Sequence, residues 1–444
     1  MATIALVEKP SPAHADIEAQ LEELRIHTVI VAFADLPGVV RGKRIPTAHF
    51  LRSLETGIPF CNAVLGWDIR GDLLTGIPWA SFQSGYPDFL ARADVGSLRV
   101  APWHEGTAYV FADLYTEHGD RVEAAPRRVL ERVVAAAETA GYRPKIGAEL
   151  EFYLTDDQRR PVFADVQAYS VEHGSLVEGV VGEIRSALLS AGIDVEAAGL
   201  EYGPTQIEIT LSYGDALSAA DDAVFFKTAV REIARQHGLR ATFMAKPWAA
   251  ESGNGFHVHQ SLWSPDGKRN FFAGNDKLAL SYVAGLLDTA RELQLLSAPT
   301  ANSYKRIRLQ SFAPTNVSWG IDNRTTATRA LLSDGGASRI EHRAGAADAN
   351  PYLIIAANIA AGLRGVTGGL EPPARVAGDA GDSDAPALPT DLAEAARLFE
   401  SSQVARELFG DDFHLAYREL ARHELAAWES AVTDWERDRY FDLA

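Results

Sequence analysis

The sequence predicts an α+β fold, in which antiparallel strands and helices follow one another along the chain. Two observations support this prediction. First, four short stretches alternate apolar and polar side chains with the period of a strand: Gly147–Leu154, Gln206–Leu211, Phe256–Leu262 and Ser338–Arg343. Second, longer stretches with helical periodicity separate these strands, at about 176–191, 216–237 and 276–296.

The composition is that of an ordinary globular protein, and its 444 residues are enough for two or three domains. The formal net charge of −18 argues against nucleic acid or an anionic membrane as a partner. No apolar run approaches the ~18 residues that a membrane-spanning helix needs, and the N-terminus lacks the pattern of a secretory signal. The single cysteine, Cys61, indicates a reducing compartment and is expected to be a small buried side chain. We therefore expect a cytoplasmic protein.

Residues 1–120 are expected to form a small α+β domain. An acidic helix at about 15–24 precedes a β-branched, apolar strand at 28–34. Residues 35–38 have the composition of a turn and 39–45 that of a returning strand, which predicts a hairpin. The other elements expected here are a loop at 62–74 and strands at 97–101 and 107–114.

Residues 121–444 are expected to form a second domain. Its first helix is predicted at 122–138, because Pro126 suits the first helical turn and apolar residues then recur at helical spacing. The four alternating strands follow. Residues 371–389 are rich in Pro, Gly, Ala and Asp, which predicts a mobile surface loop. Amphipathic helix is predicted from about 391 to 440.

The strand at Gly147–Leu154 has two different faces. Apolar side chains form one face, whereas Glu149 and Glu151 share the other, with Cα atoms about 6–7 Å apart. Two carboxylates at that distance repel each other unless water or cations surround them. The other three alternating strands also carry Glu, His and Arg where a solvated face usually carries Thr, Ser and Lys. A solvated face is the alternative for any single strand, but the four together predict the wall of one charged channel.

Five carboxylates and one imidazole are candidate metal ligands on or beside these strands: Glu149, Glu151, Glu201, Glu208, Glu341 and His257. So many carboxylates around one cavity stay ionised only when cations neutralise them. Oxygen ligands with a single imidazole suit Mg²⁺ or Mn²⁺ better than Zn²⁺. Six ligands are too many for one ion that keeps its waters, so we expect two or three ions.

Five arginines cluster near the last of these strands: Arg306, Arg324, Arg329, Arg339 and Arg343. The arginine fork binds phosphate and carboxylate bidentately. Divalent ions and several arginines around one cavity predict a site that holds a polyphosphate and transfers a phosphoryl group. The sequence has neither a Walker loop nor a kinase signature, so metal ions rather than a Gly-rich loop would hold the phosphates. A surface salt bridge is the alternative for any single arginine.

These residues lie in motifs that resemble the type I glutamine synthetase superfamily, across nearly the whole chain. The motifs are Gly147-Ala-Glu-Leu-Glu-Phe152, Glu201–Glu208 with Gln206 between, Lys246-Pro247, Gly253-Asn-Gly-Phe-His-Val-His-Gln-Ser261, Asn302-Ser-Tyr-Lys-Arg306, Asn323-Arg324, Arg339-Ile-Glu-His-Arg343 and Asn350-Pro351. Each motif is weak alone, but the set in this order is highly specific. The resemblance implies a β-grasp N-terminal domain and a catalytic domain whose antiparallel sheet lines the active-site channel. It also implies a homo-oligomer, a hexameric ring or a dodecamer, with active sites between subunits.

The resemblance implies a role for each of these residues. One metal ion, near the amino acid, would be held by Glu151, Glu201 and Glu208. A second ion, on the ATP phosphates, would be held by Glu149, His257 and Glu341. Glutamate would be bound by Arg306, Arg343 and the backbone at Gly253. ATP would be contacted by His259, Ser261, Arg329 and Arg339, and Arg324 would steady the transferred phosphoryl group in its catalytic role.

The implied reaction has two steps. The γ-carboxylate of glutamate attacks the γ-phosphate of ATP, which gives a γ-glutamyl phosphate, and an amine nitrogen then attacks this intermediate. Phosphorylation is needed because a carboxylate alone would have to expel oxide. The metal ions and Arg324 would offset the repulsion between two anions as they meet.

Two departures from the family pattern bear on the nitrogen substrate. Ammonia-using members carry a flap glutamate in a Tyr-Glu-Ala-Pro context, whereas this chain has Ser311-Phe312-Ala313-Pro314. A phenyl ring cannot accept a proton from ammonium, but it can pack on an alkyl or aryl group. In the N-terminal domain, Gly66-Trp67-Asp68 stands where the family has an Asp-Gly-Ser-Ser context. Asp68 is therefore the candidate proton acceptor, and Trp67 joins Phe312 as an amine-pocket candidate, although packing aromatics and a turn aspartate are the structural alternatives.

The sequence thus predicts a glutamate–amine ligase for a small monoamine with an apolar tail, such as an alkylamine, ethanolamine or aniline. The alternatives are an ammonia-dependent glutamine synthetase and a γ-glutamylpolyamine synthetase, whose diamines call for acidic groups at the far end of the pocket. A non-catalytic structural relative and a His-X-His metal hydrolase are disfavoured by the complete ligand set and the arginines. No adenylylation loop is recognisable near Gly378–Asp391, so that control is expected to be absent.

Overall fold

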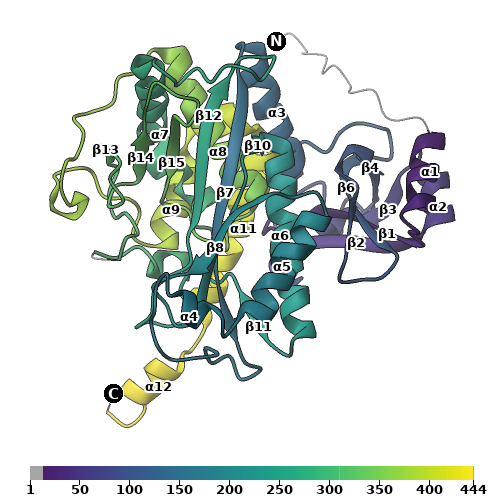
Figure 1. Cartoon of the computed structure of the whole chain (residues 1–444), viewed down its shortest axis with the longest axis horizontal. Helices are drawn as coiled ribbons and strands as arrows, with labels where there is room; N and C mark the ends of the chain where they lie inside the picture. The colour runs from purple at the N-terminus through teal and green to yellow at the C-terminus, as the bar shows by residue number, and fades with distance from the viewer. Residues whose placement is uncertain (1–13, 310, 444) are drawn as a thin grey trace.

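The computed structural model describes residues 14–309 and 311–443 and confirms the α+β class. Two sheets lie side by side, each with its own helices (Figure 1). The smaller sheet comes from the first quarter of the chain and the larger sheet from the middle. The division at residue 120 into two folding units stays a prediction.

The smaller sheet has the strand order β2-β1-β6-β4-β3, with β5 paired to β6. The parallel pair β1–β6 lies between antiparallel neighbours, which is the β-grasp arrangement that the resemblance implied. Its elements are α1 (His14–Glu23), β1 (Thr28–Ala34), β2 (Val40–Pro46), α2 (Thr47–Ser53), β3 (Ile58–Cys61), η1 (Asn62–Leu65), β4 (Asp88–Ala93), η2 (Val95–Ser97), β5 (Arg99–Val100) and β6 (Thr107–Thr116).

Strand β1 was predicted correctly because its run of β-branched and apolar residues is buried on both faces. Val29 and Val31 pack with α1 and α2, whereas Ile30 and Ala32 belong to the main core. The predicted hairpin with β2 is also present, in antiparallel register. The smaller sheet is therefore held between its own two helices and the rest of the protein.

Five elements of this region were missed: α2, β3, β4 and the short 3₁₀ turns η1 and η2. Strand β3 contains Pro59 and lies at the sheet edge, where proline is tolerated because no partner strand needs its N–H. The expectation that Cys61 is buried is wrong, since Cys61 ends this edge strand and is exposed.

The larger sheet has the strand order β13-β14-β15-β12-β7-β9-β8, with β10 and β11 paired to β7. The four predicted charged strands are β15, β12, β7 and β9, which are consecutive in this order. All its pairings are antiparallel except β13 with β14. Its strands are β7 (Arg143–Thr155), β8 (Val195–Leu200), β9 (Gln206–Leu211), β10 (Gly214–Asp215), β11 (Arg240–Thr242), β12 (Phe256–Trp263), β13 (Trp319–Ile321), β14 (Thr328–Leu331) and β15 (Arg339–His342).

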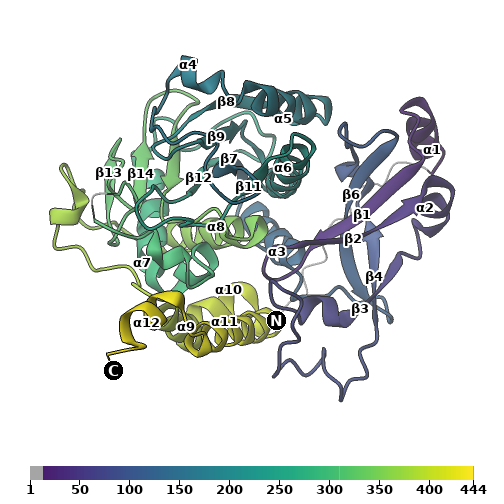
Figure 2. The same cartoon turned by 90° about the horizontal axis from the view of Figure 1, so that it is seen from below.

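Helices cover the apolar face of this sheet (Figure 2). The apolar side chains of β7 and β12 pack with α6 and α8 in the main core. The opposite face carries the charged side chains. The helices of this part are α3 (Pro126–Thr139), α4 (Val171–Gly174), α5 (Glu178–Ser190), α6 (Ala216–Gln236), α7 (Asp276–Ser297), η3 (Ser303–Lys305) and α8 (Pro351–Gly368). The helix predicted at 122–138 starts at Pro126, which occupies its first turn.

Helix α8 was not predicted, because it is buried almost all round and so lacks an amphipathic period. Asn350 accepts the N–H of Tyr352 and thereby caps the helix. The same side chain donates to the carbonyl oxygen of Asp35 in the β1–β2 turn, at 2.9 Å. The first turn of α8 is thus tied directly to the smaller sheet.

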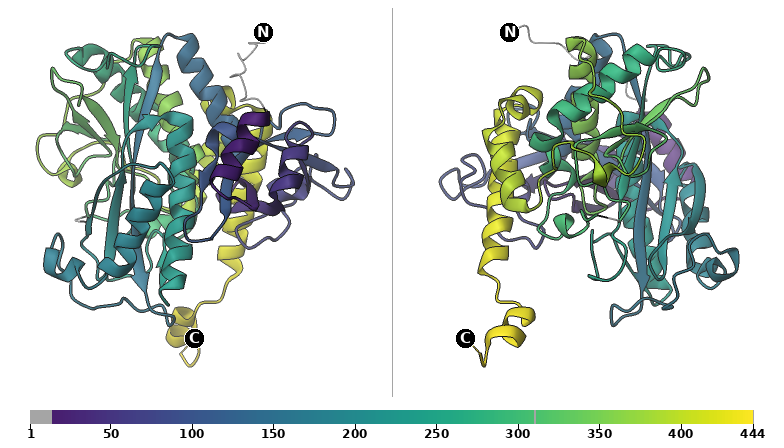
Figure 3. Two further views of the ribbon diagram at one scale, coloured as in Figure 1. Left: turned by 45° about the vertical axis from the view of Figure 1, so that its right-hand side comes forward. Right: turned by 90° about the vertical axis from the view of Figure 1, so that its left-hand side faces the viewer.

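The chain ends in helices rather than one long helix: α9 (Leu392–Ser401), α10 (Gln403–Phe409), α11 (Asp411–Ser430) and α12 (Asp434–Tyr440). The breaks fall at Ser402, Gly410 and 431–433. Figure 3 shows α12 extending away from the body of the molecule. The predicted loop at 371–389 contains one short helical turn, η4 (Ala380–Asp382). Within the described part of the chain, no helix has both the length and the apolar character needed to cross a membrane.

Candidate active site

The strand register of the larger sheet brings the predicted metal ligands together. Glu149 on β7 pairs with His257 on β12, and Glu151 on β7 pairs with Glu208 on β9. Glu341 on β15 lies opposite His259 on β12. Directly opposed residues place their side chains on the same face, with Cβ atoms about 5 Å apart. The charged faces of four separate sequence segments therefore form one surface, as predicted.

Within the acidic cluster, two groups of ligand atoms are close enough to share a cation. Glu149, His257 and Glu341 form one group and Glu151, Glu208 and His257 the other, each with ligand atoms within 4.8 Å of one another. His257 Nδ1 lies 2.6 Å from Glu149 Oε1 and 3.7 Å from Glu341 Oε1. The cluster is largely buried: His257 is 4% exposed and Glu341 1% exposed.

Electrostatic repulsion within this cluster is visible in the pKa values of its carboxyl groups. Burial, with Glu149, Glu151 and Glu201 nearby, raises the pKa of Glu208 to about 10. Burial and the Glu151 carboxylate raise the pKa of Glu201, just after β8, to about 7. Burial also acts on Glu149, but hydrogen bonds from His257 and His259 hold its pKa well below the usual range. Carboxyl groups crowded in this way fit a divalent cation, which would favour their ionised form.

The arginines divide between this cluster and its edge. Burial would raise the pKa of Glu341, but Arg343 in particular holds it below the usual value. Arg329 Nη1 donates to Glu341 Oε2 at 3.0 Å. Arg343 also donates to the carbonyl oxygen of Arg324, at 3.1 Å, while the side chain of Arg324 is exposed. Arg324 is therefore held by its backbone beside the cluster, with its guanidinium free to reach a ligand.

Arg306 is buried beneath the cluster, and its Nη2 atom lies 3.4 Å from His257 Nε2. Among the described residues its Nη1 nitrogen has no hydrogen-bond partner, although it is buried. An unpaired donor of this kind is costly unless a ligand satisfies it, and a carboxylate is the natural partner of a guanidinium. Gly253 makes room for this side chain, because a Cβ there would lie 2.7 Å from both Arg306 Cγ and the carbonyl oxygen of Ala245.

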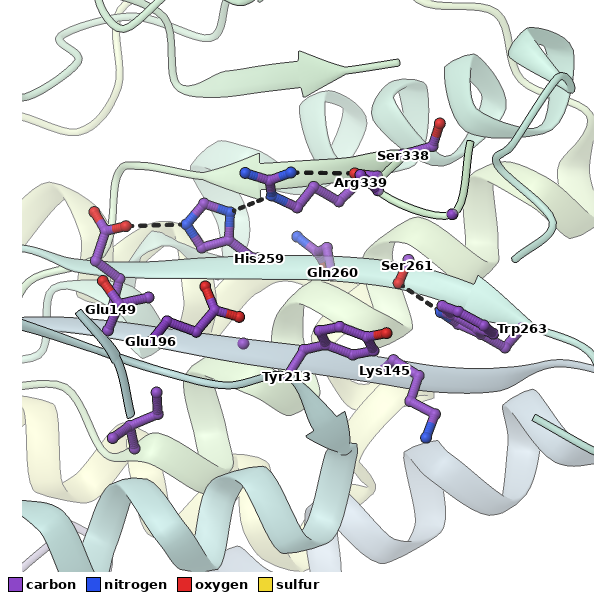
Figure 4. A pocket seen from close by; sticks show the side chains of 15 residues that line it. Lys145, Glu149, Glu196, Tyr213, His259, Gln260, Ser261, Trp263, Ser338 and Arg339 are labelled. Carbon is purple, nitrogen blue, oxygen red and sulfur yellow. Dashed lines mark hydrogen bonds and ion pairs between the residues drawn. The ribbon is translucent and has the colours of Figure 1, made fainter. Parts of the chain in front are cut away.

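A cavity of about 390 Å³ opens beside the acidic cluster, between β12, β7 and the loop before β15 (Figure 4). Three of the four predicted ATP residues line it: His259, Ser261 and Arg339. Glu149, His259 and Arg339 form a continuous chain, with contacts of 3.1 Å and 3.3 Å. The fourth predicted residue, Arg329, lies on β14 beside Glu341 rather than in the cavity wall. The cavity and the acidic cluster thus share Glu149.

Sequence reasoning missed several side chains of the cavity, among them Glu196, Tyr213 and Trp263 (Figure 4). The rings of Tyr213 and Trp263 are stacked at an angle of 22°, with centroids 6.0 Å apart. Trp263 follows His257, His259 and Ser261 at a spacing of two, so the period of β12 could have revealed it. Glu196 lies at a β-bulge in β8, where simple alternation fails. The bulge explains why no periodic signal marked it.

The two departures from the family pattern lie at different places. Phe312 is exposed in the segment after η3, and its ring centroid lies 5.5 Å from that of Tyr202. Asp68 is buried and accepts backbone N–H groups of Arg70 and Asp72, both at 2.8 Å, so within its own chain it is a turn aspartate. Trp67 packs beneath the guanidinium of Arg41. Asp68 also lies 3.5 Å from His423 Nε2 on α11, and the roles of Trp67 and Asp68 at an active site stay predictions.

Comparison with known proteins agrees with this geometry. A family model described as the glutamine synthetase catalytic domain matches residues 123–440. A glutamate–isopropylamine ligase of a Pseudomonas species is 38% identical over 443 residues, covering 95% of this chain and 96% of the relative. A gamma-glutamylethanolamide synthetase of Streptomyces coelicolor is 41% identical over 432 residues, covering 94% of this chain and 93% of the relative.

A solved structure of ligand-free GmaS superposes on this chain with a TM-score of 0.86 and 31% sequence identity. The superposition covers 96% of this chain and 100% of that one. The likeness therefore includes both sheets and not only the catalytic region. The chain belongs to the glutamine synthetase family.

Proposed function

We propose that this protein is an ATP-dependent ligase that joins the γ-carboxylate of glutamate to an organic amine. The observation that carries the proposal is the position of one acidic cluster between two ligand sites. The buried, unpaired nitrogen of Arg306 lies on one side and the cavity lined by His259 and Arg339 on the other. Two relatives are named for the joining of glutamate to isopropylamine and for a γ-glutamylethanolamide, which supports an amine as the second substrate.

Divalent cations fit the acidic cluster, and enzymes of this family use them together with ATP. We propose that Mg²⁺ or Mn²⁺ is held by the two ligand groups around His257, with two or three ions in each site. When bound, such ions offset the negative charge of phosphate and carboxylate and so allow the two anions to approach. The chain contributes the ordered carboxylates and the histidine that fix where this positive charge lies.

The chain's own residues bind and orient both anionic reactants. Arg306 and Arg343, with the backbone at Gly253, hold the carboxylates of glutamate, so that its γ-carboxylate faces the cavity. His259, Ser261 and Arg339 contact ATP in the cavity, and Arg329, which donates to Glu341, contacts it from beside the cluster. Arg324, exposed at the edge of the cluster, reaches the phosphoryl group during transfer and stabilises its charge.

The reaction follows from this arrangement in two steps. An oxygen of the γ-carboxylate attacks the γ-phosphorus of ATP, the bond to ADP breaks, and γ-glutamyl phosphate forms. The neutral amine nitrogen then attacks the acyl carbon, phosphate leaves with the carboxylate oxygen, and the nitrogen gives up a proton. We propose Asp68, reaching across from a neighbouring subunit, as the group that accepts this proton.

Phe312 favours an organic amine over ammonia. The ring offers no group that can accept a proton from ammonium, whereas it can pack on an alkyl or aryl tail. Trp67 of a neighbouring subunit would complete the apolar surface. The second candidate function is an ammonia-dependent glutamine synthetase, which the retained metal and arginine residues also fit. A polyamine ligase is a further possibility, and it would need carboxylates at the end of the amine pocket.

We further propose a homo-oligomer, a hexameric ring or a dodecamer, in which active sites form between subunits. Within its own chain Asp68 contacts Arg70, Asp72 and His423, and Trp67 contacts Arg41, so a role for them in catalysis would come from a second subunit. The single cysteine and the acidic net charge suit the cytoplasm.

The test is a coupled measurement of ADP release with ammonium and with a panel of amines, each at saturating ATP and glutamate. We expect a higher kcat/KM for a small monoamine than for ammonium, and a product with the mass of the γ-glutamylamide. Saturation by ammonium at millimolar concentration or below, with no preference for any amine, would refute the proposal in favour of glutamine synthetase.

A further inference from the structure

Two aromatic rings form an exposed pair at the edge of the active site. Tyr202 is 51% exposed and Phe312 is 55% exposed, and their ring centroids lie 5.5 Å apart at an interplanar angle of 41°. They come from segments more than a hundred residues apart in the sequence. The ring area that still faces water is unfavourable, and a bound ligand that covers it would remove this cost.

The pair lies next to Glu201, one of the carboxylates that we expect to hold the metal ion near the amino acid. Tyr202 directly follows Glu201, and its backbone N–H donates to the Glu201 carboxylate at 3.3 Å. That carboxylate in turn interacts with Glu151 and Glu149 of the acidic cluster. Tyr202 is therefore one residue away from the cluster, and neither ring lines the cavity beside it.

The backbone of Phe312 is strained. Its φ angle is +54°, in the left-handed region that a bulky side chain rarely adopts. Such strain persists only where the surrounding structure fixes the residue. Ala313 and Pro314, which follow it, are buried and anchor the segment.

The space beyond Phe312 has one charged side chain of each sign in its lining. A cavity of about 230 Å³ there is lined by Phe312, Leu309, Ala313 and Thr325 together with Arg308 and Asp379. Asp379 accepts the N–H of Gly381 at 2.9 Å, and its carboxylate and the Arg308 guanidinium together leave the lining without net charge. The lining is therefore suited to a neutral tail.

We propose that the Tyr202–Phe312 pair is the tail subsite of the amine substrate and selects a primary amine with a short neutral alkyl or aryl tail. The inference rests on the proposed function and adds Tyr202 as a specificity-determining residue. The amine nitrogen reaches the acyl phosphate near Glu201, while its tail lies against the two rings and removes apolar surface from water.

The test compares the wild-type protein with Tyr202→Ala and Tyr202→Phe over ammonium, methylamine, ethylamine, propylamine and putrescine. In the wild type, kcat/KM should rise about two- to fourfold for each added tail carbon, as expected for burial of a methylene group. Tyr202→Ala should flatten this rise while leaving the KM for ATP close to that of the wild type. Tyr202→Phe should restore the rise, because it keeps the ring. Leu189→Ala, an exposed apolar side chain on α5, is the control for a surface substitution.

Each outcome decides the inference. A rise with tail length that survives in Tyr202→Ala would overturn it while leaving the ligase intact, and so would a preference of the wild type for putrescine over propylamine. Turnover of ammonium alone by the wild type would instead overturn the proposed function itself. This last result would be seen before any variant is made, so the two failures are distinguishable.

Discussion

Magnesium binding should depend steeply on pH, because the acidic cluster holds extra protons when no cation is present. In the metal-free protein the pKa of Glu201 is raised from 4.5 to about 7, and that of Glu208 to about 10. A carboxyl group must lose its proton before it binds a cation. Cation binding at pH 6 therefore releases protons, and the affinity increases as the pH rises.

The size of the effect follows from these pKa values. A single ligand with a pKa of about 7 is about nine-tenths protonated at pH 6 and about one-tenth protonated at pH 8. Glu201 alone should therefore strengthen magnesium binding by about tenfold over this range. Glu208 remains protonated across the range without metal and adds to the increase. Isothermal titration calorimetry at both pH values, in two buffers that differ in ionisation enthalpy, measures the affinity and the protons released.

The raised pKa values also affect the stability of the metal-free protein. Magnesium affinity increases as the pH rises, whereas this contribution to stability decreases. A carboxyl group with a raised pKa in the folded state stabilises the metal-free protein at acidic pH, and this contribution is lost as the pH rises from about 4.5 through about 7. The difference between 4.5 and about 7 corresponds to about 3 kcal/mol for Glu201. Addition of magnesium should thus raise the melting temperature more at pH 8 than at pH 6. In Glu201→Gln, which cannot titrate, the pH dependence should shrink. Equal magnesium affinity at pH 6 and pH 8, with no proton release, would refute the reasoning.

Three further predictions concern single side chains. Arg306→Lys should raise the KM for glutamate about 10- to 100-fold with a much smaller change in the KM for ATP, because the bidentate fork is lost; an equal effect on both substrates would contradict its assignment. Trp263→Ala should raise the KM for ATP about fivefold by removing one ring of the stacked pair, and an unchanged value would exclude these rings from the nucleotide site. Asn350→Ala should lower the free energy of unfolding by about 2 kcal/mol, since it removes a helix cap and the bond to the β1–β2 turn. Asn275→Ala removes only the cap of α7 and should cost about 1 kcal/mol in denaturant unfolding, so equal losses would argue against the link between the sheets.

Strands whose environment agrees with their local pattern were predictable from the sequence. Strand β9 was located to the residue, because its apolar face meets the core and its polar face meets the cluster. The charged faces of β7, β12 and β15 were recognised for the same reason. Helix α8 was missed because burial on all sides removes the periodic signal that distinguishes helix from strand.

The candidate site was predictable where it follows strand alternation and not where it depends on loops. His257 and His259 share a face with Trp263, so the side chains on β12 could be read from one period. Arg306, by contrast, lies after a short helical turn, and nothing in the local sequence shows that it is buried under the cluster. The positive φ angle of Phe312 and its contact with Tyr202 depend on tertiary packing between distant segments.

If γ-glutamyl phosphate is the intermediate, an oxygen of the glutamate γ-carboxylate is transferred to phosphate during synthesis of the amide. This transfer is tested most directly with glutamate labelled by ¹⁸O in the γ-carboxylate, ATP, magnesium and a small monoamine, followed by mass spectrometry of the phosphate released. One labelled oxygen is expected in the phosphate for each γ-glutamylamide formed. Release of unlabelled phosphate while the γ-glutamylamide forms would contradict this transfer.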